Sequence, residues 1–282
     1  MKSLNPELLI NGQPYSKVLR KNERKRKEVR KGREARKDKY ALNEPITYTA
    51  KDIVEKNGKK YLKIKLNKRS VLLPVLNIGS ENKPEYIAIL DPNDKTVLRH
   101  STKELAHILD KLNISLVITP PSSKSERLVE KSRRLAKIKN PPLVLFGGST
   151  QKDGQKYLYT QQDVIDLVDD GTRYWTISCK PITLKKDGPS KYFGINETQL
   201  KKIVASINNG EKIAIVDDVF SSGATIRAII ELLTRALNQL NIKVPELPIV
   251  VIAEERLEQK LDKKANELEI YSKVVIPVLN NI

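Results

Sequence analysis

Two short apolar runs, separated by an amphipathic segment, constrain the fold of this chain most strongly. The run ISLVIT at 114–119 is rich in β-branched residues and does not alternate with polar ones, which is typical of a strand buried on both faces of a parallel sheet. The segment SERLVEKSRRLAKI that follows has helical periodicity, and PPLVLFG is a second buried strand. Strand, helix and strand in this order predict a βαβ unit with a parallel sheet.

The same rhythm continues to the end of the chain. Helices are predicted over NETQLKKIVASI and TIRAIIELLTRAL, and a further helix over 101–112 is expected to begin with a capping box of Ser101 and Glu104. Further strands are RYWTISC at 173–179, KIAIV, IVVIA at 249–253 and KVVIPVL at 273–279. We therefore predict an α/β fold with one doubly wound, mainly parallel sheet.

The region before this sheet has a different pattern. From residue 46 the chain reads as β structure, and Asn57-Gly58 followed by the alternating KKYLKIKL predicts a hairpin with a type I′ turn. Short strands are also predicted at 70–76 and 86–90. We divide the chain into a leader at 1–45 and a domain at 46–282 that opens with this β-hairpin region.

The leader carries much of the chain's net charge of +18. Residues 17–39 hold 13 Lys or Arg against 4 Asp or Glu. Such a segment is typical of a basic helix or disordered arm that neutralises nucleic-acid phosphates. Residues 17–39 contain no aromatic residue to stack on bases, and only Tyr40 follows at their end. A solubilising segment without a fixed partner therefore remains the alternative.

Composition also excludes several classes of protein. No apolar run approaches the roughly 20 residues of a membrane span, and the N-terminus lacks the apolar core of a secretory signal. Cys179 is the single cysteine, which excludes a disulfide framework or a cysteine-based metal site within one chain. We therefore expect a cytoplasmic protein without a membrane partner.

The segment KIAIVDDVFSSGAT carries the clearest functional signal. Asp217 and Asp218 follow a buried strand, at the end of a parallel sheet where ligands bind. Two adjacent carboxylates repel each other, so they require hydroxyl donors or a cation to stay ionised. The turn beyond them opens a helix, whose free N–H groups and dipole favour a phosphate. Acids beside a phosphate site suit a sugar phosphate.

This segment resembles a known family. IAIVDDVFSSGAT is similar, position for position, to the motif of the type I phosphoribosyltransferases. LLPVLNI followed by YIAILD resembles the opening of purine-type members, and LVITPPSSKSERLVEKSRRLA resembles their strand, loop and helix at the pyrophosphate. SKYFGINETQLKKIVASINNGEKIAIVDDV is similar to the run from the mobile catalytic loop into the motif. The resemblance covers about residues 46–282.

The resemblance implies a reaction and roles for individual residues. Asp217 and Asp218 would be the catalytic pair that holds the ribose hydroxyls of phosphoribosyl pyrophosphate (PRPP). The 5-phosphate would bind to the turn residues Ser221, Ser222, Gly223, Ala224 and Thr225. Magnesium would be carried by substrate oxygens, without a direct protein ligand. The second substrate would be a nucleobase, a purine by this likeness, and family members are commonly homodimers.

The chain also departs from the family pattern. The loop TPPSSKSER offers Lys124 as a pyrophosphate contact, and Gly147-Gly148 stand where relatives tend to place a basic residue. Lys185 and Lys186 in the long polar segment before SKYFG are alternative sources of positive charge, as is Lys152.

Two functions from different classes therefore stay open. The first is a phosphoribosyltransferase that releases pyrophosphate from PRPP. The second is a non-catalytic regulatory protein that senses PRPP or a nucleotide and binds nucleic acid through residues 17–39. A structural relative that has lost ligand binding is the third possibility. Near the expected site, Trp175 is interpreted as core rather than base-stacking, and Glu254 with Glu255 as a solvated pair.

Overall fold

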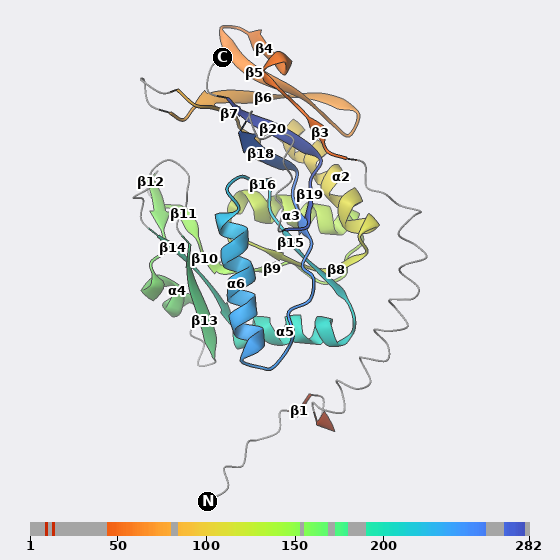
Figure 1. Ribbon diagram of the computed structural model, residues 1–282, viewed down its shortest axis with the longest axis vertical. Coiled ribbons are helices and arrows are strands. Elements are labelled where there is room, and N and C mark those ends of the chain that lie inside the picture. Colours follow the sequence, from red (N-terminus) through yellow and green to blue (C-terminus); the bar gives the residue numbers. More distant parts are fainter. Residues whose placement is uncertain are drawn as a thin grey trace, which may run out of the picture.

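Most of the chain beyond the leader is described by the computed structural model shown in Figure 1. The described residues are 9–10, 13–14, 44–79, 84–152, 155–168, 173–179, 190–257 and 268–279. The basic segment 17–39, with its predicted nucleic-acid contact, lies outside them. Two residue pairs of the leader form a small ladder of β1 (Leu9–Ile10) and β2 (Gln13–Pro14).

A five-stranded parallel sheet forms the centre of the molecule. Its strand order is β19-β17-β15-β8-β9, and every pairing in it is parallel. The strands are β8 (Ile114–Thr119), β9 (Leu143–Val144), β15 (Lys212–Val216), β17 (Ile249–Val250) and β19 (Ile270–Tyr271). The βαβ unit predicted from ISLVIT onward is confirmed by the pairing of β8 with β9.

Both faces of this sheet are covered by helices (Figure 1). Ile213 and Ile215 of β15 belong to the core cluster that contains the apolar sides of α5 and α6. Ala214 and Val216 belong to the opposite cluster, with α2 and α3. Because both faces are buried, the strand needs an unbroken apolar run, as the sequence has. The helices are α2 (Lys95–Lys111), α3 (Ser123–Leu135), α5 (Glu197–Asn208) and α6 (Ala224–Asn238).

A second sheet of eight strands lies beyond one end of the first (Figure 1). Its order is β16-β18-β20-β7-β6-β5-β4, with β3 (Ile46–Thr47) beside β20. The other strands are β4 (Ile53–Lys56), β5 (Lys59–Leu66), β6 (Arg69–Asn77), β7 (Tyr86–Ala88), β16 (Val219–Phe220), β18 (Ala253–Leu257) and β20 (Val274–Leu279). A short 3-10 helix, η2 (Ala50–Asp52), precedes β4.

The predicted N-terminal hairpin is confirmed, and two sheet assignments are corrected. Asn57 and Gly58 join β4 to β5 with φ of 52° and 69°, as a type I′ turn requires. The run at 273–279 was expected to complete the parallel sheet. It forms β20 instead, which lies between β18 and β7 in the second sheet. The run at 173–179 was also expected in the parallel sheet, but it pairs antiparallel in a third sheet. The single predicted sheet is therefore divided among three, of which only the five-stranded sheet is wholly parallel.

Antiparallel elements lie at one flank of the molecule. The strands β13 (Tyr174–Cys179) and β14 (Lys191–Asn196) pair with each other, and β10 (Phe146–Gly147) pairs with β14. The ladder of β11 (Ser149–Lys152) and β12 (Gln155–Leu158) precedes α4 (Gln161–Val168). Trp175 packs in the core and donates from Nε1 to Gln239 Oε1 at 2.7 Å, so its interpretation as a core residue is confirmed.

The first helix begins earlier than its capping pattern indicated. α2 starts at Lys95, and Asp94 caps it by accepting hydrogen bonds from the N–H groups of Thr96 and Val97. Ser101 and Glu104 lie buried inside the helix, and Glu104 Oε1 accepts from Asn67 N at 2.5 Å. The predicted capping box was therefore wrong, because Glu104 is a buried carboxylate within the helix and not a capping residue at its start. Among the described residues, none of the helices is long and apolar enough to span a bilayer.

Candidate functional site

The candidate site lies where strands leave the parallel sheet and enter the second one. β15 is followed by Asp217 and Asp218 and then by β16, while β17 and β19 continue into β18 and β20 in the same way. Backbone hydrogen bonds hold this crossing in place. Asp217 N donates to Val250 O at 3.2 Å, and Ile252 N donates to Asp218 O at 3.1 Å. The two aspartates therefore occupy a fixed position at the carboxyl end of the central strand.

A hydroxyl group from a different element stabilises the acid pair. Ser125, in the first turn of α3, donates from Oγ to Asp217 Oδ1 at 2.6 Å and lies 3.5 Å from Asp218 Oδ1. Asp218 N also donates to Asp217 Oδ1 at 2.9 Å, and Val219 N donates to Asp218 Oδ1 at the same distance. The expected hydroxyl donor is thus present, although sequence reasoning assigned this loop's contribution to Lys124.

The site concentrates negative charge. Burial raises the pKa of Asp217 well above its usual value, and the charge of Asp218 raises it further, while the Ser125 hydrogen bond acts in the opposite direction. Burial and the charge of Asp218 also raise the pKa of Glu255 to about 7. The three carboxyl groups are therefore short of positive charge, so a cation near them would be favourable.

The turn after the acid pair has the geometry expected of an anion site. Gly223 adopts φ of 73° and precedes α6 without a side-chain cap. Ala224 N makes a long hydrogen bond of 3.4 Å to Ser222 Oγ, and the next N–H groups of the first turn face no side-chain cap from Gly223. Ser222 is exposed, and Ser221, Ala224 and Thr225 are partly exposed. The five turn residues predicted to hold a phosphate are therefore brought together at the start of one helix.

Two cations flank this turn. Arg227 donates from Nη1 to the Ser222 carbonyl oxygen at 2.8 Å. Lys191, the first residue of β14, donates from Nζ to Thr225 Oγ1 at 3.2 Å and lies 5.1 Å from the centre of the Phe193 ring. Sequence reasoning missed Lys191 because it treated 180–194 as one exposed excursion. Its only sequence signal is that a Lys directly precedes the apolar run YFGI.

The glycine pair where relatives tend to place a basic residue is explained by packing. Gly147 and Gly148 have φ of 89° and 78°. A Cβ on Gly147 would overlap the Tyr192 carbonyl oxygen and lie 2.5 Å from Val164 Cγ2. A Cβ on Gly148 would lie 2.8 Å from Pro121 Cγ. Two close approaches therefore exclude any larger side chain, and with it a cation, from this strand end.

The acidic pair after β17 is not solvated as expected. Glu254 is 4% exposed, forms an ion pair with Arg256 and accepts a hydrogen bond from the Ser272 hydroxyl. Glu255 is partly buried. The prediction of a solvated pair was therefore wrong, because β18 continues the chain into the second sheet where solvent had been expected.

The remaining predicted cations are only partly placed. Lys124 lies in the first turn of α3, next to Ser125, but its side chain is outside the described residues. Lys185 and Lys186 fall outside the described residues altogether, and Lys152 lies in β11 without a described side chain. The pyrophosphate contacts predicted for these lysines stay predictions.

No family model matches the chain, and no curated protein matches it significantly. Among solved structures, an adenine phosphoribosyltransferase from Thermoanaerobacter pseudethanolicus is 17% identical with a TM-score of 0.37, over 65% of this chain and 83% of that one. The Trypanosoma brucei adenine phosphoribosyltransferase in complex with AMP, pyrophosphate and ribose-5-phosphate is 13% identical with a TM-score of 0.37, over 67% and 69%. A purine phosphoribosyltransferase from Pyrococcus horikoshii is 16% identical with a TM-score of 0.30, over 65% and 93%.

All three proteins are named as phosphoribosyltransferases, and the motif of this chain resembles a family of phosphoribosyltransferases. At TM-scores below 0.5 the similarity is too partial to decide an activity, so a functional proposal has to rest on the residues of this chain.

Proposed function

We propose that the protein is a phosphoribosyltransferase that transfers the ribose phosphate of PRPP to a nucleobase, a purine, and releases pyrophosphate. One observation supports this proposal more strongly than any other. The buried Asp217 and the partly buried Asp218 lie a few residues before the N-terminus of α6 on one segment. Lys191 and Arg227 flank that helix N-terminus. A ribose phosphate offers hydroxyl groups to the two carboxylates and a phosphate to the helix N-terminus.

Each part of the segment has a defined task in this proposal. Asp217 and Asp218 accept hydrogen bonds from the two ribose hydroxyls, and Ser125 keeps Asp217 oriented from behind. The N–H groups and hydroxyls of the turn bind the 5-phosphate. Lys191 lies beside Thr225 and adds a positive charge on that side. Hydrogen bonds between charged and polar groups of this kind contribute about 1.5–3 kcal/mol each.

Magnesium fits the chemistry of this site. Burial and the charge of Asp218 raise the pKa of both Asp217 and Glu255, which indicates that a divalent cation would be stabilised by these carboxyl groups. Among the described residues, no cluster of three or more His, Cys, Asp or Glu forms a complete metal-ligand set. A magnesium ion carried on PRPP oxygens would neutralise the charge of the pyrophosphate, and the carboxyl groups of Asp218 and Glu255 would favour a cation there.

The protein's own contribution to the reaction is positioning and electrostatics. A ring nitrogen of the base attacks C1 of the ribose as the bond from C1 to the pyrophosphate oxygen breaks. Pyrophosphate leaves with the electron pair, and the base loses one proton. Positive charge develops on the ribose ring during this exchange, and the carboxylates of Asp217 and Asp218 would stabilise it.

The decisive experiment is an activity assay with a panel of bases. The protein is incubated with PRPP, magnesium and each of several purine and pyrimidine bases, and pyrophosphate release is followed. We expect release with at least one purine and none from Asp217→Asn/Asp218→Asn. Absence of release with every base would overturn the enzyme proposal.

A second candidate function is favoured by the glycine pair. Gly147 and Gly148 leave no room for a cation at the strand end next to Pro121, so the pyrophosphate would lack a positive contact there. A protein with this departure could bind PRPP or a nucleotide without turnover and act as a regulatory sensor that contacts nucleic acid through residues 17–39. Measurable PRPP binding without pyrophosphate release from any base would select this function.

A further inference from the structure

The helices α2 and α3 pack side by side (Figure 1). A groove with basic walls runs between them. Its volume is about 580 Å³. It is lined by six cationic side chains: Lys95, Arg99, Lys103, Arg127, Lys131 and Arg134. No carboxylate lines it. We call it the α2/α3 groove, and it is separate from the turn at the start of α6, which covers the opposite face of the parallel sheet.

The cations form two regular rows. Lys95, Arg99 and Lys103 recur every four residues along α2, so successive charges are separated by a rise of about 6 Å. Arg127 and Lys131 repeat the same interval on α3. All five side chains are exposed. Two facing rows with a regular repeat match a partner whose negative charges also repeat regularly.

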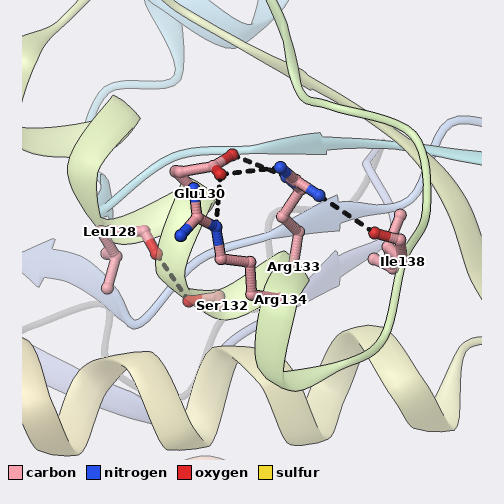
Figure 2. Close-up of polar contacts among 6 residues, drawn as sticks. All are labelled: Leu128, Glu130, Ser132, Arg133, Arg134 and Ile138. Carbon is pink, nitrogen blue, oxygen red and sulfur yellow. Dashed lines mark hydrogen bonds and ion pairs between the residues drawn. The ribbon is translucent and has the colours of Figure 1, made fainter.

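Most of this positive charge is not neutralised by the protein. Arg134 donates to Glu130, which also binds Arg133, as Figure 2 shows. Within the part of the chain that the structure describes, the other five groove cations take part in no ion pair. Burial lowers the pKa of the nearby His100 imidazole, and the charges of Arg99 and Lys103 lower it further. The groove therefore has an uncompensated positive field.

The floor of the groove is largely apolar. Leu98 lies buried beneath it, and Leu135 at one end is 57% exposed. Thr102 also lines it, and its hydroxyl has no hydrogen-bond partner among the described residues although the residue is only 5% exposed. A second hollow of about 350 Å³ shares Lys103 and Leu135 and continues along α2, where His107 and Asp110 line it. The combined surface is elongated rather than a closed pocket.

We propose that the α2/α3 groove binds the sugar-phosphate backbone of a nucleic-acid strand without reading its sequence. The regular rows of Lys and Arg would contact successive phosphates, and the apolar floor would face the sugars. No aromatic side chain lines the groove, so bases find no stacking platform there. An acidic protein segment is the less favoured occupant, because its charges rarely repeat at one fixed interval. This site is additional to the predicted contact of residues 17–39.

The first test maps binding on the full-length protein by lysine acetylation. The probe is a mixed-sequence single-stranded DNA oligonucleotide of about 20 nucleotides, long enough to cover the groove. Acetylation of Lys95, Lys103 and Lys131 is followed by mass spectrometry with and without the probe at low salt. Three exposed lysines of β5 provide the internal control: Lys59, Lys60 and Lys63. This readout separates the groove from the leader, because each lysine is measured individually.

We expect the probe to slow acetylation of the three groove lysines at least threefold and to leave the β5 lysines unchanged. Failure of the oligonucleotide to bind at low salt would overturn the proposal, and so would binding without protection of the groove lysines. Protection by poly-glutamate but not by the oligonucleotide would assign the groove to an acidic protein partner instead.

The second test measures salt dependence in variants. The triple variant Arg99→Gln/Lys103→Gln/Lys131→Gln removes three exposed charges, and Lys59→Gln/Lys60→Gln/Lys63→Gln removes three others as a control of equal charge. Each lost phosphate contact reduces the slope of log affinity against log salt by about 0.7 for a single strand. We expect the slope of the groove variant to be smaller in magnitude than that of the wild type by about 2. We expect the control variant to have the slope of the wild type. Equal slopes for both variants would contradict the proposal.

Discussion

At the scale of single residues, Asp217 is placed for a ligand at a cost in stability. Its pKa is raised by burial and by Asp218. For an acid with a raised folded pKa, stability is greatest below the unfolded pKa and is lost as pH rises towards the folded value. At neutral pH this buried acid therefore lowers the stability of the free protein, and the sugar hydroxyls of a ligand would offset this cost.

We predict that Asp217→Asn increases the free energy of unfolding of the free protein at neutral pH by about 1 kcal/mol. Asparagine keeps an oxygen for the Ser125 hydroxyl and the Asp218 N–H group while it removes the like-charge repulsion. Thermal denaturation without ligand measures the effect, and Asp110→Asn at an exposed position of α2 is the control. A variant less stable than the wild type would show that the carboxylate is structural.

Glu255 gives the site a pH dependence of its own. Burial and Asp218 raise its pKa to about 7, so its contribution to stability is present below its unfolded pKa and is lost as the pH rises to about 7. Between pH 5 and pH 8 we expect the free energy of unfolding of the wild type to fall by on the order of 2 kcal/mol more than that of Glu255→Gln. This figure allows for the partial exposure of Glu255. Unfolding in urea at pH 5 and pH 8 measures it. Identical pH profiles for the two proteins would rule out this coupling.

Lys191 is the residue with the most specific role that the sequence did not predict. Its ammonium group contacts Thr225 at the start of α6. We predict that Lys191→Gln weakens PRPP binding about tenfold, because one charged hydrogen bond contributes about 1.5–3 kcal/mol. Calorimetric titration measures this, with Lys201→Gln on the exposed side of α5 as the control. Equal affinity for both variants would remove Lys191 from the phosphate site.

At the scale of elements, the strand end after β10 depends on glycine for space as well as for backbone conformation. We predict that Gly147→Ala lowers the free energy of unfolding by about 3 kcal/mol, since the new Cβ meets Tyr192 and Val164. Gly210→Ala is the matched control. It has φ of 70° with no atom within 4 Å of the added Cβ, so it should cost about 1 kcal/mol. Chemical denaturation compares them, and equal costs would contradict the packing explanation.

At the scale of the whole molecule, the sequence predicted local elements better than their assembly. The unalternating run at β15 and the Asn57-Gly58 turn carry their own physical signals, and both predictions are confirmed. The sequence of a strand carries no comparable signal for which other strand it pairs with. β20 is as apolar as a central parallel strand, yet it pairs with β18 and with β7 from the N-terminal region. The second sheet therefore could not be anticipated from periodicity.

The candidate site was likewise predicted only where its residues are close together in the sequence. Asp217, Asp218 and the turn residues are contiguous, so one motif predicted them together. Ser125 and Lys191 reach the site from 92 and 34 residues away in sequence, relative to Asp217 and Thr225. No local pattern links residues at such separations, and only the fold brings them together.

The central claim is that the segment from Asp217 to Thr225 binds a ribose phosphate. Calorimetric titration of PRPP with magnesium into the wild type and into Asp217→Asn/Asp218→Asn tests it most directly. We predict measurable binding by the wild type and at least about a 100-fold loss in the variant, since two charged hydrogen-bond acceptors disappear, while its unfolding transition remains cooperative. Undiminished binding by the folded variant, or no binding by the wild type, would contradict the claim.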